Sequence, residues 1–506
     1  TAEAFRFLNQ ATFGATEFES EAVRSMELEA WIDRQIATPA SLQLPHLQAL
    51  PRPQFLFELQ GDRIDIWFRN SLSGPDQLRQ RVAFALSQIM VVSQVGALSN
   101  QTYALASYYD MLAQNAFANY RDLIEDVTLH PAMGVYLSML GNEKPNAALN
   151  IRPDENYARE LMQLFSIGLV ELNVDGTPAL DQNGSTVPTY DQSVIEGFAH
   201  VYTGWNYAGA PGFRSAFVND FNQTVPMQLY PDFHDTGEKT LLGDVVIPAG
   251  QTGDQDLADA LDNIFNHPNV GPFVAIRLIQ RLTTSNPSPG YVQRVAEVFN
   301  DNGTGVRGDL AAVVRAILLD DEARPGMAME IDGKLKEPLL RLMQLYKAYD
   351  ATSQSGRMAF EAASIFFGQG PLQSPSVFNF FSPFYAPPGE IRDSGLVAPE
   401  LQIATEYQNT LVTNYFFIQA FGLNSASTEL GEDDIYIVIS EEIAIAADSA
   451  ALVDRVSEKL LAGQMSPALR GEIIAMVERI PAADSVARAA EAIYLTASSP
   501  EYAYQR

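Results

Sequence analysis

The amino-acid sequence predicts a mostly α-helical fold, in which one large multi-helix domain carries short β-hairpin insertions and precedes a small C-terminal helical subdomain. Apolar residues recur at the three- and four-residue spacing of amphipathic helices through most of the 506 residues. Turn signals typical of hairpins concentrate in a single region. We therefore expect a main domain over residues 1–400, a hairpin and loop insertion at about 172–252, and a C-terminal subdomain over 401–506 packed on the main domain.

Composition narrows the classes of protein to which the chain can belong. Hydrophobic residues make up 47% of the chain, enough for a large core, so global disorder is excluded. A formal net charge of −30, with no block of basic residues, argues against a nucleic-acid partner. No apolar run approaches the length of a membrane-spanning helix. The chain has no cysteine, which excludes disulfides, thiolate metal sites and cysteine nucleophiles.

The compartment is predicted from two features of the sequence. Cysteine is absent, and the chain begins at Thr1 without an initiator methionine. The absence of cysteine fits an exported protein, although a cytosolic protein can also lack cysteine. The start at Thr1 favours a mature chain from which an export signal has been removed. We therefore expect an exported protein, either periplasmic or extracellular.

The helices can be assigned in order from apolar periodicity and capping residues. In the first part of the chain we expect helices over 17–36, from Pro75-Asp76 onward, and over 103–114 and 120–129. After the insertion begins, the expected helices span 192–203, 254–266, 271–284, 289–301, 309–321, 335–350, 357–368, 400–423, 449–462, 466–478 and 484–498. Residues 435–439 alternate weakly like a strand, and the Pro- and aromatic-rich residues 371–388 are expected to wrap the core.

A central helix from Asp154 to Gly168 organises the functional prediction. Asp154 is placed to cap its first turn, and Gly168 can adopt a left-handed conformation at its end. One face is apolar and must be buried. Five hydrogen-bonding side chains share the opposite arc: Glu155, Asn156, Arg159, Glu160 and Gln163.

This polar arc has two interpretations. If it lines a cavity, Glu155 and Glu160 are candidate catalytic carboxylates, with Asn156 and Arg159 as candidate substrate-binding groups. The alternative is structural, because Glu155 and Arg159 lie four residues apart and can form a solvated ion pair. A buried network is a second structural alternative, with Arg81 or Arg79 pairing with Glu160.

Histidines supply the remaining catalytic candidates. His200 lies four residues after Glu196, a spacing that suits a divalent-metal pair or an ion pair. His234 and Asp235 lie in an irregular loop with Lys239, and loops commonly carry catalytic groups. Asp235 can orient an imidazole, or both residues can ligate a divalent metal. A surface histidine that caps a turn is the simpler alternative. Trp205 and Lys239 are further candidate substrate-binding residues.

Two turns in the insertion weakly predict a calcium-binding site. Asp175, Asp181 and Asn183 offer oxygen ligands within Asx-Gly turns. The spacing of an EF-hand loop is absent, however, and Asx side chains in tight turns explain the same composition.

A resemblance to a known family rests on motifs distributed along the chain. They are Gln77-Leu78-Arg79-Gln80-Arg81, His130-Pro131-Ala132-Met133, Glu155-Asn156-Tyr157-Ala158-Arg159-Glu160-Leu161-Met162, Tyr202-Thr203-Gly204-Trp205, His234-Asp235-Thr236-Gly237-Glu238-Lys239-Thr240, Ser374-Pro375-Ser376-Val377-Phe378 and Ser499-Pro500-Glu501-Tyr502. Together they resemble the bacterial family called domain of unknown function 1800.

The resemblance implies a mostly helical, exported protein, and it suggests a partner, because genes of this family often adjoin those of a sulfatase-like family. In relatives a histidine often follows the Gln-Leu pair of the central helix, whereas this chain has Phe165 there.

Two hypotheses follow from the sequence. The first is a hydrolase-type enzyme that acts on an extracellular or periplasmic polymer through Glu155, Glu160, His200, His234 and Asp235, with or without a divalent metal. In this hypothesis Arg159, Lys239 or Arg81 stabilises anionic charge. The second is a non-catalytic binding or assembly protein that works with a sulfatase-like partner. The first hypothesis requires the carboxylates of the central helix and the later imidazoles to share one solvent-reachable cleft.

Overall fold

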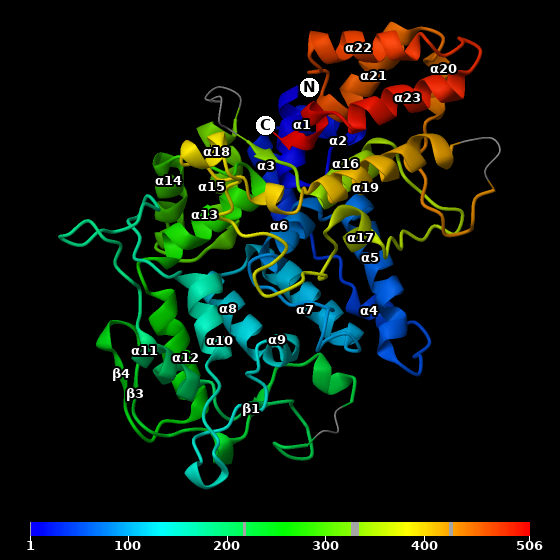
Figure 1. The fold of residues 1–506 in the computed structure, drawn as a ribbon. Coiled ribbons are helices and arrows are strands. Elements are labelled where there is room, and N and C mark those ends of the chain that lie inside the picture. Colours follow the sequence, from blue (N-terminus) through cyan, green and yellow to red (C-terminus); the bar gives the residue numbers. More distant parts are fainter. Residues whose placement is uncertain (1, 216–218, 325–332, 425–428, 506) are drawn as a thin grey trace.

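Helices dominate the computed structural model of the chain, which describes residues 2–215, 219–324, 333–424 and 429–505 (Figure 1). Within these ranges there are 24 α-helices and three two-stranded antiparallel sheets. The predicted mostly α-helical class is confirmed. Among the described helices, none is both long and apolar enough to cross a membrane.

The first eleven helices build the centre of the molecule and one of its ends. They are α1 (Ala2–Ala11), α2 (Glu17–Arg24), α3 (Leu28–Ala37), α4 (Leu44–Gln48), α5 (Gln60–Ser73), α6 (Gln77–Ser87), α7 (Thr102–Gln114), α8 (Tyr120–Leu129), α9 (Pro131–Tyr136), α10 (Asn156–Glu160) and α11 (Gln192–Val201). The prediction of a single helix over 17–36 is wrong, because the chain turns after Ser25 and Glu27 is extended before α3. This turn lets α2 pack on α1, while α3 packs on α6.

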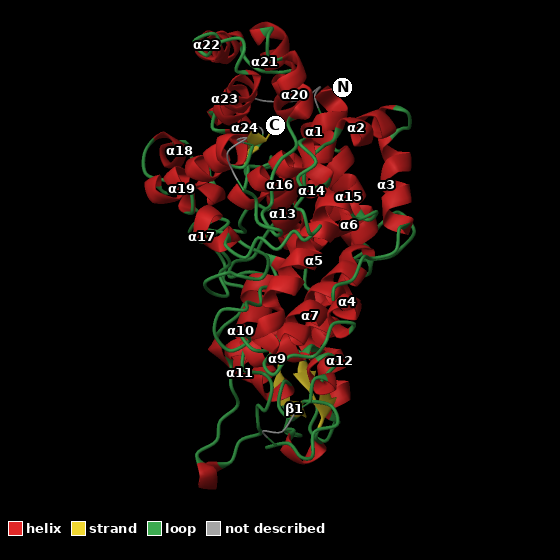
Figure 2. Ribbon diagram, turned by 90° about the vertical axis from the view of Figure 1, so that its right-hand side faces the viewer, coloured by secondary structure: helices red, strands yellow, loops and turns green. Residues whose placement is uncertain are grey.

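Helix α6 lies near the middle of the fold in both ribbon views (Figures 1 and 2). Every residue of α6 is buried, so its polar side chains need partners inside the protein. The guanidinium of Arg79 donates hydrogen bonds to the backbone carbonyls of Ile36, Thr38, Ala113 and Gln114. Arg81 donates to the carbonyl of Arg281 at 2.6 Å. Neither arginine makes an ion pair or hydrogen bond with Glu160, which corrects that part of the sequence prediction.

The insertion contains the predicted turns and two short antiparallel strand pairs. The turns at 173–176 and 181–184 are flanked by isolated bridges, and the segment between α10 and α11 projects from the body (Figure 1). β1 (Trp205–Asn206) pairs with β2 (Gln228–Leu229), and β3 (Lys239–Thr240) pairs with β4 (Val246–Ile247). Alternation along β3 buries Lys239 and exposes Thr240, so the pairing turns the lysine towards the core.

The second half of the chain adds thirteen described helices. They are α12 (Gly253–Phe265), α13 (Val270–Leu282), α14 (Pro289–Asn300), α15 (Leu310–Leu319), α16 (Pro338–Ala348), α17 (Ala363–Phe367), α18 (Glu390–Asp393), α19 (Glu406–Phe417), α20 (Ser440–Ile445), α21 (Ser449–Leu461), α22 (Pro467–Val477), α23 (Ser485–Ala497) and α24 (Pro500–Ala503). Helices α20–α23 gather at one end of the molecule (Figures 1 and 2).

A short sheet ties the C-terminal end to the main body. β5 (Lys334–Leu335) pairs antiparallel with β6 (Tyr504–Gln505), and this pair joins segments far apart in sequence. The helix predicted over 357–368 is shorter than expected. The strand predicted over 435–439 forms only a bridge between Tyr436 and Thr352. Its apolar alternation instead reflects Ile435, Ile437 and Ile439, which are buried in the core.

Candidate functional site

The central helix is shorter than predicted and ends in a π-helical turn. Asp154 caps it as expected, because its carboxylate accepts a hydrogen bond from the backbone N–H of Asn156 at 2.8 Å. After α10 the chain continues as a π-helix over Leu161–Ser166, and Gly168 then adopts a positive φ of 74°. π-Helical turns often mark functional sites in helices. This one begins directly after Glu160.

The i, i+4 ion pair on the polar arc is present. Arg159 Nη2 donates to Glu155 Oε2 at 3.0 Å, and Gln192 from α11 donates to the same oxygen at 2.9 Å. Both charged side chains are partly exposed. Asn156 is exposed beside them. These contacts fit the solvated ion pair that the sequence offered as an alternative.

Glu160 differs from Glu155 because it points into the protein. It is only 7% exposed, and its Oε2 is buried with no hydrogen-bond partner among the described residues. Burial raises the pKa of Glu160, although the positive charge of Arg159 acts in the opposite direction. The hydroxyl of Tyr190 is likewise buried without a described partner, and burial raises the pKa of Tyr190 to about 12.

His200 forms a partly exposed dyad with Asp235. Asp191 caps the start of α11, and His200 lies in the last turn of that helix. His200 Nδ1 contacts Asp235 Oδ2, and the two side chains are 32% and 21% exposed. The hydrogen bond from His200 is the largest cause that lowers the pKa of Asp235 to about 2. No described residue forms a hydrogen bond or ion pair with His200 Nε2, so this nitrogen is the one left for a substrate or a water molecule.

Thr203 holds the dyad in place. Its hydroxyl donates to the carbonyl of His200 at 2.7 Å and accepts from the backbone N–H of Asp235 at 2.9 Å. The backbone N–H of Gly237 donates to Asp235 Oδ1 at 2.8 Å. Asp235 therefore presents its other oxygen, Oδ2, to the imidazole.

A second, fully buried cluster lies beside this dyad. His234 Nε2 and Lys239 Nζ both contact Asp256 Oδ2, at 3.0 and 2.6 Å. His234 Nδ1 lies 2.9 Å from the carbonyl oxygen of Thr203, so both ring nitrogens face acceptors. Burial acts to raise the pKa of Asp256, but the hydrogen bonds from His234 and Lys239 outweigh it and lower that pKa.

Asp256 is a member of the site that the sequence analysis missed. It lies on α12 at the same face as the buried Ala260 and Ile264, spaced four residues apart. An acidic residue at an inward position of an amphipathic helix was therefore the available signal, because such a carboxylate must find a partner.

Lys239 connects the two clusters. Its ammonium donates to the carbonyls of Asp235 and Gly237, at 2.6 and 2.9 Å, as well as to Asp256. The loop that carries Asp235 is thus anchored to a buried charge. We infer no direct substrate contact for Lys239, since its side chain is inaccessible.

Glycines bring these elements close enough to make the contacts. Gly197 of α11 has its α-carbon against β3, where an added Cβ would lie 2.0 Å from the carbonyl oxygen of Thr240. At Gly204, with a φ of +86°, an added Cβ would lie 2.9 Å from His234. Trp205 follows and is buried, so it lies in the core beside the site.

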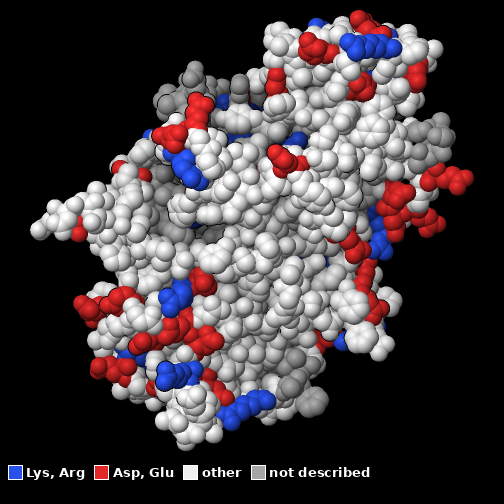
Figure 3. Space-filling view, viewed as in Figure 1, with Lys and Arg blue, Asp and Glu red and all other residues white. Residues whose placement is uncertain are grey.

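The structure therefore divides the predicted residues between two groups. Glu155, Asn156, Arg159 and Glu160 lie together on α10, whereas His200, His234, Asp235 and Lys239 lie around the end of α11 and β3. No hydrogen bond or ion pair between described residues joins these groups. Charged side chains gather on the visible face over this end of the molecule (Figure 3).

Other predicted ligands lie elsewhere. Arg81 is buried in α6, while Asp175 and Asp181 accept hydrogen bonds within their own turns, from Thr177 and from the backbone of Asn183 and Ser185. Across the described ranges, no group of three or more His, Asp or Glu side chains is arranged to hold a metal ion.

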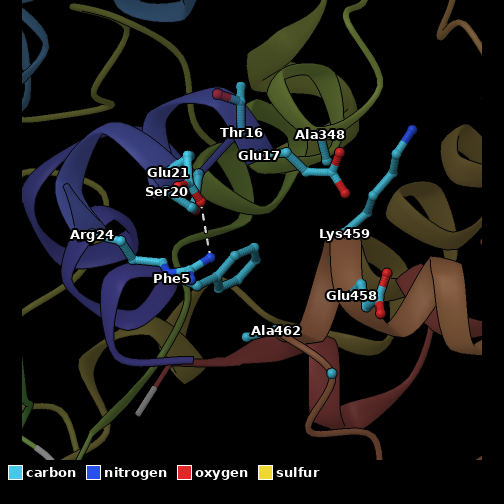
Figure 4. A pocket seen from close by; sticks show the side chains of 12 residues that line it. Phe5, Thr16, Glu17, Ser20, Glu21, Arg24, Ala348, Glu458, Lys459 and Ala462 are labelled. Carbon is cyan, nitrogen blue, oxygen red and sulfur yellow. Dashed lines mark hydrogen bonds and ion pairs between the residues drawn. The ribbon is translucent and has the colours of Figure 1, made fainter. Parts of the chain in front are cut away.

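Two hollows occur at the opposite end, between the N-terminal helices and the C-terminal ones. The first has a volume of about 510 Å³, with Glu17, Glu21 and Arg24 of α2 on one side and Glu458 and Lys459 of α21 on the other (Figure 4). The second has a volume of about 870 Å³. None of the sequence-predicted site residues lines either hollow.

Comparison with protein families decides where the chain belongs. The family model described as protein of unknown function (DUF1800) matches residues 6–504. The chain belongs to this family. The match begins in α1 and ends in β6, so the DUF1800 unit includes both the main body and the C-terminal helices. Comparison with curated proteins and with solved structures gives no match.

Proposed function

We propose that this DUF1800 protein is a hydrolase-type enzyme that acts on an extracellular or periplasmic polymer, with the His200–Asp235 dyad as its acid–base group. A single observation carries the proposal: His200 binds a carboxylate through Nδ1, its Nε2 has no hydrogen-bond partner among the described residues, and its side chain is 32% exposed. This is the arrangement in which an imidazole exchanges protons with a substrate or water.

Each residue of the dyad has a role in the proposed reaction. Asp235 is ionised at neutral pH, because the hydrogen bond from His200 keeps its pKa low. It orients the imidazole and stabilises the imidazolium that forms when Nε2 takes a proton from attacking water. The imidazolium then returns that proton to the leaving group. Lys239 is a positioning residue, since it anchors the backbone of the Asp235 loop.

Glu160 is a second candidate proton donor within this proposal. Its raised pKa and the unpartnered Oε2 favour a protonated carboxyl that can donate a hydrogen bond. It lies in the α10 group, which makes no hydrogen bond or ion pair with the dyad among the described residues, although α10 and α11 pack on each other. Its participation therefore requires a substrate that contacts both groups at once.

A non-catalytic binding or assembly protein is the alternative function. One observation favours it: the two hollows described above lie far along the fold from the dyad and share no residue with it. In this alternative, export and a sulfatase-like partner remain parts of the proposal, and the dyad stabilises the end of α11.

The test is hydrolysis of a panel of p-nitrophenyl esters, glycosides, phosphates and sulfates. His200→Gln and Asp235→Asn should each lower turnover by about 10²–10⁴-fold for any compound that the wild type cleaves. His46→Gln is the matched control, since His46 is exposed and remote in sequence, and it should retain activity. Unchanged turnover in both dyad variants would refute the catalytic role, and inactivity of the wild type on every class would favour the binding alternative.

A pH series gives an independent check of the dyad. The pKa of Asp235 is lowered in the folded protein, so its contacts contribute stability above the ordinary carboxyl pKa of about 3.9. That contribution is lost as the pH falls from about 4 towards 2. The melting-temperature difference between wild type and Asp235→Asn should therefore be present at pH 7 and disappear in acid. A pH-independent difference would mean that the ion pair does not form in solution.

A further inference from the structure

Lys336 is an exception among the lysines of this protein. The chain has only six lysines. Four of them pair with carboxylates: Lys239 with Asp256, Lys334 with Glu400, Lys347 with Glu19 and Lys459 with Glu442. Lys144 is exposed. Lys336 is buried, yet the described residues place no carboxylate within ion-pair distance of it.

The surroundings of Lys336 favour the neutral amine. Its Nζ donates to Gln344 Oε1 at 2.6 Å and lies 4.4 Å from the centre of the Tyr502 ring. Burial is the main cause that lowers the pKa of Lys336 to about 7, and the nearby charge of Arg341 lowers it further. About half of an amine with such a pKa is unprotonated at neutral pH, and only this form is nucleophilic.

Lys336 also lines the larger of the two hollows. The hollow of about 870 Å³ has walls from α1, from the end of α21 and from the segment that holds α24 and β6. This volume lies within the range of about 300–1,000 Å³ that is usual for small-molecule sites. The position of the lysine is held by the backbone, because its N–H donates to the carbonyl of Ala503 at 2.8 Å beside the β5–β6 pair.

We propose that Lys336 is a reactive amine that captures small aldehydes or ketones as an imine in the hollow between α1 and the C-terminal helices. The geometry supports this assignment through three features together: a buried amine, no carboxylate of the described residues within ion-pair distance, and a ligand-sized hollow that Lys336 lines. The site lies at the opposite end of the fold from the His200–Asp235 dyad and does not depend on the activity proposed there.

The reaction balances without a further reagent. The Nζ lone pair attacks the carbonyl carbon, and a proton moves from nitrogen to the carbonyl oxygen to give a carbinolamine. Loss of water, with the hydroxyl taking a proton, then leaves a carbon–nitrogen double bond. Gln344 Oε1 accepts an N–H of the free amine and so orients its lone pair.

The test is reductive trapping with propanal and sodium cyanoborohydride on the folded full chain at pH 7, followed by peptide mass spectrometry. Lys336 should be alkylated at least about tenfold faster than exposed Lys144, because a far larger fraction of Lys336 is unprotonated. Lys347 is the buried control with a carboxylate partner: Glu19 pairs with its ammonium at 2.8 Å and opposes the lowering of its pKa by burial, so it should react more slowly than Lys336.

A conservative variant separates amine chemistry from access. Gln344→Glu places a carboxylate beside Nζ, which favours the ammonium, and should slow labelling of Lys336 at pH 7 at least about tenfold while Lys144 is unchanged. Circular dichroism confirms that the variant is folded, and Lys336→Met assigns the modified peptide. The proposal is overturned if wild-type Lys336 reacts no faster than Lys144, or if Gln344→Glu leaves its labelling rate unchanged.

Discussion

Replacing Asp256 by asparagine tests the buried cluster on which the loop of the dyad rests. The change removes the one carboxylate of the described residues that Lys239 and His234 share, and their side chains are no more than 2% exposed. Breaking a buried pair from one side costs about 3–5 kcal/mol. Lys239 keeps two carbonyl acceptors, on Asp235 and Gly237, so we expect the free energy of unfolding to fall by an amount near the lower limit, about 3 kcal/mol.

Urea unfolding followed by far-UV circular dichroism at pH 7 measures this loss as a lower midpoint. Asp259→Asn is the matched control on the same helix, because Asp259 is exposed, and it should change stability by no more than about 0.5 kcal/mol. The double variant Lys239→Met with Asp256→Leu should lose less than the sum of the single changes, since it leaves no unpaired lysine.

The stability difference between wild type and Asp256→Asn should depend on pH in one direction. The pKa of Asp256 is lowered in the folded protein, so its contacts contribute stability above the ordinary carboxyl pKa of about 3.9 and lose that contribution as the pH falls through the folded value. The difference from wild type should therefore shrink below pH 4. Equal urea midpoints at pH 7 would refute the reasoning that this cluster holds the loop.

Two further predictions concern α11 and α10. Gly197→Ala should destabilise the protein by about 1–3 kcal/mol or more, because the new methyl group meets the Thr240 carbonyl. Differential scanning calorimetry measures this destabilisation as a lower melting temperature. A melting temperature equal to that of wild type would show that α11 and β3 are not so close. Glu160→Gln should raise stability at pH 8 but not at pH 4, because the pKa of Glu160 is raised in the folded protein and the wild type loses stability as the pH rises through that pKa. The urea unfolding midpoints of variant and wild type at pH 4 and pH 8 test this prediction. A variant less stable than wild type at pH 8 contradicts it.

Features set by neighbouring residues were predictable. The α8 helix spans the predicted residues 120–129, and Asp191 caps α11 through its contacts with Ser193 and Val194. The ion pair between Glu155 and Arg159 follows from their spacing on one helix. Each of these depends on interactions within about one helical turn.

Features set by packing were not predictable. The break between α2 and α3 and the π-helical turn after Glu160 each depend on which neighbouring helix a segment meets. The partner of His234 is Asp256, 22 residues away along the chain. The inward position of Asp256 on α12 indicates that this acid needs a buried partner, but no local pattern identifies that partner as His234.

The helical class, the family and the residue types capable of acid–base chemistry could all be read from the amino-acid sequence, because periodicity, caps and motifs are properties of short segments. The pairing of partly exposed His200 with Asp235, the burial of His234 against Asp256, and the lack of a hydrogen bond or ion pair between Glu160 and either histidine became clear only from the folded chain. The physical reason is that burial and pairing depend on the contacts between distant segments, and these contacts decide which ionisable groups keep their charge and which can meet a substrate.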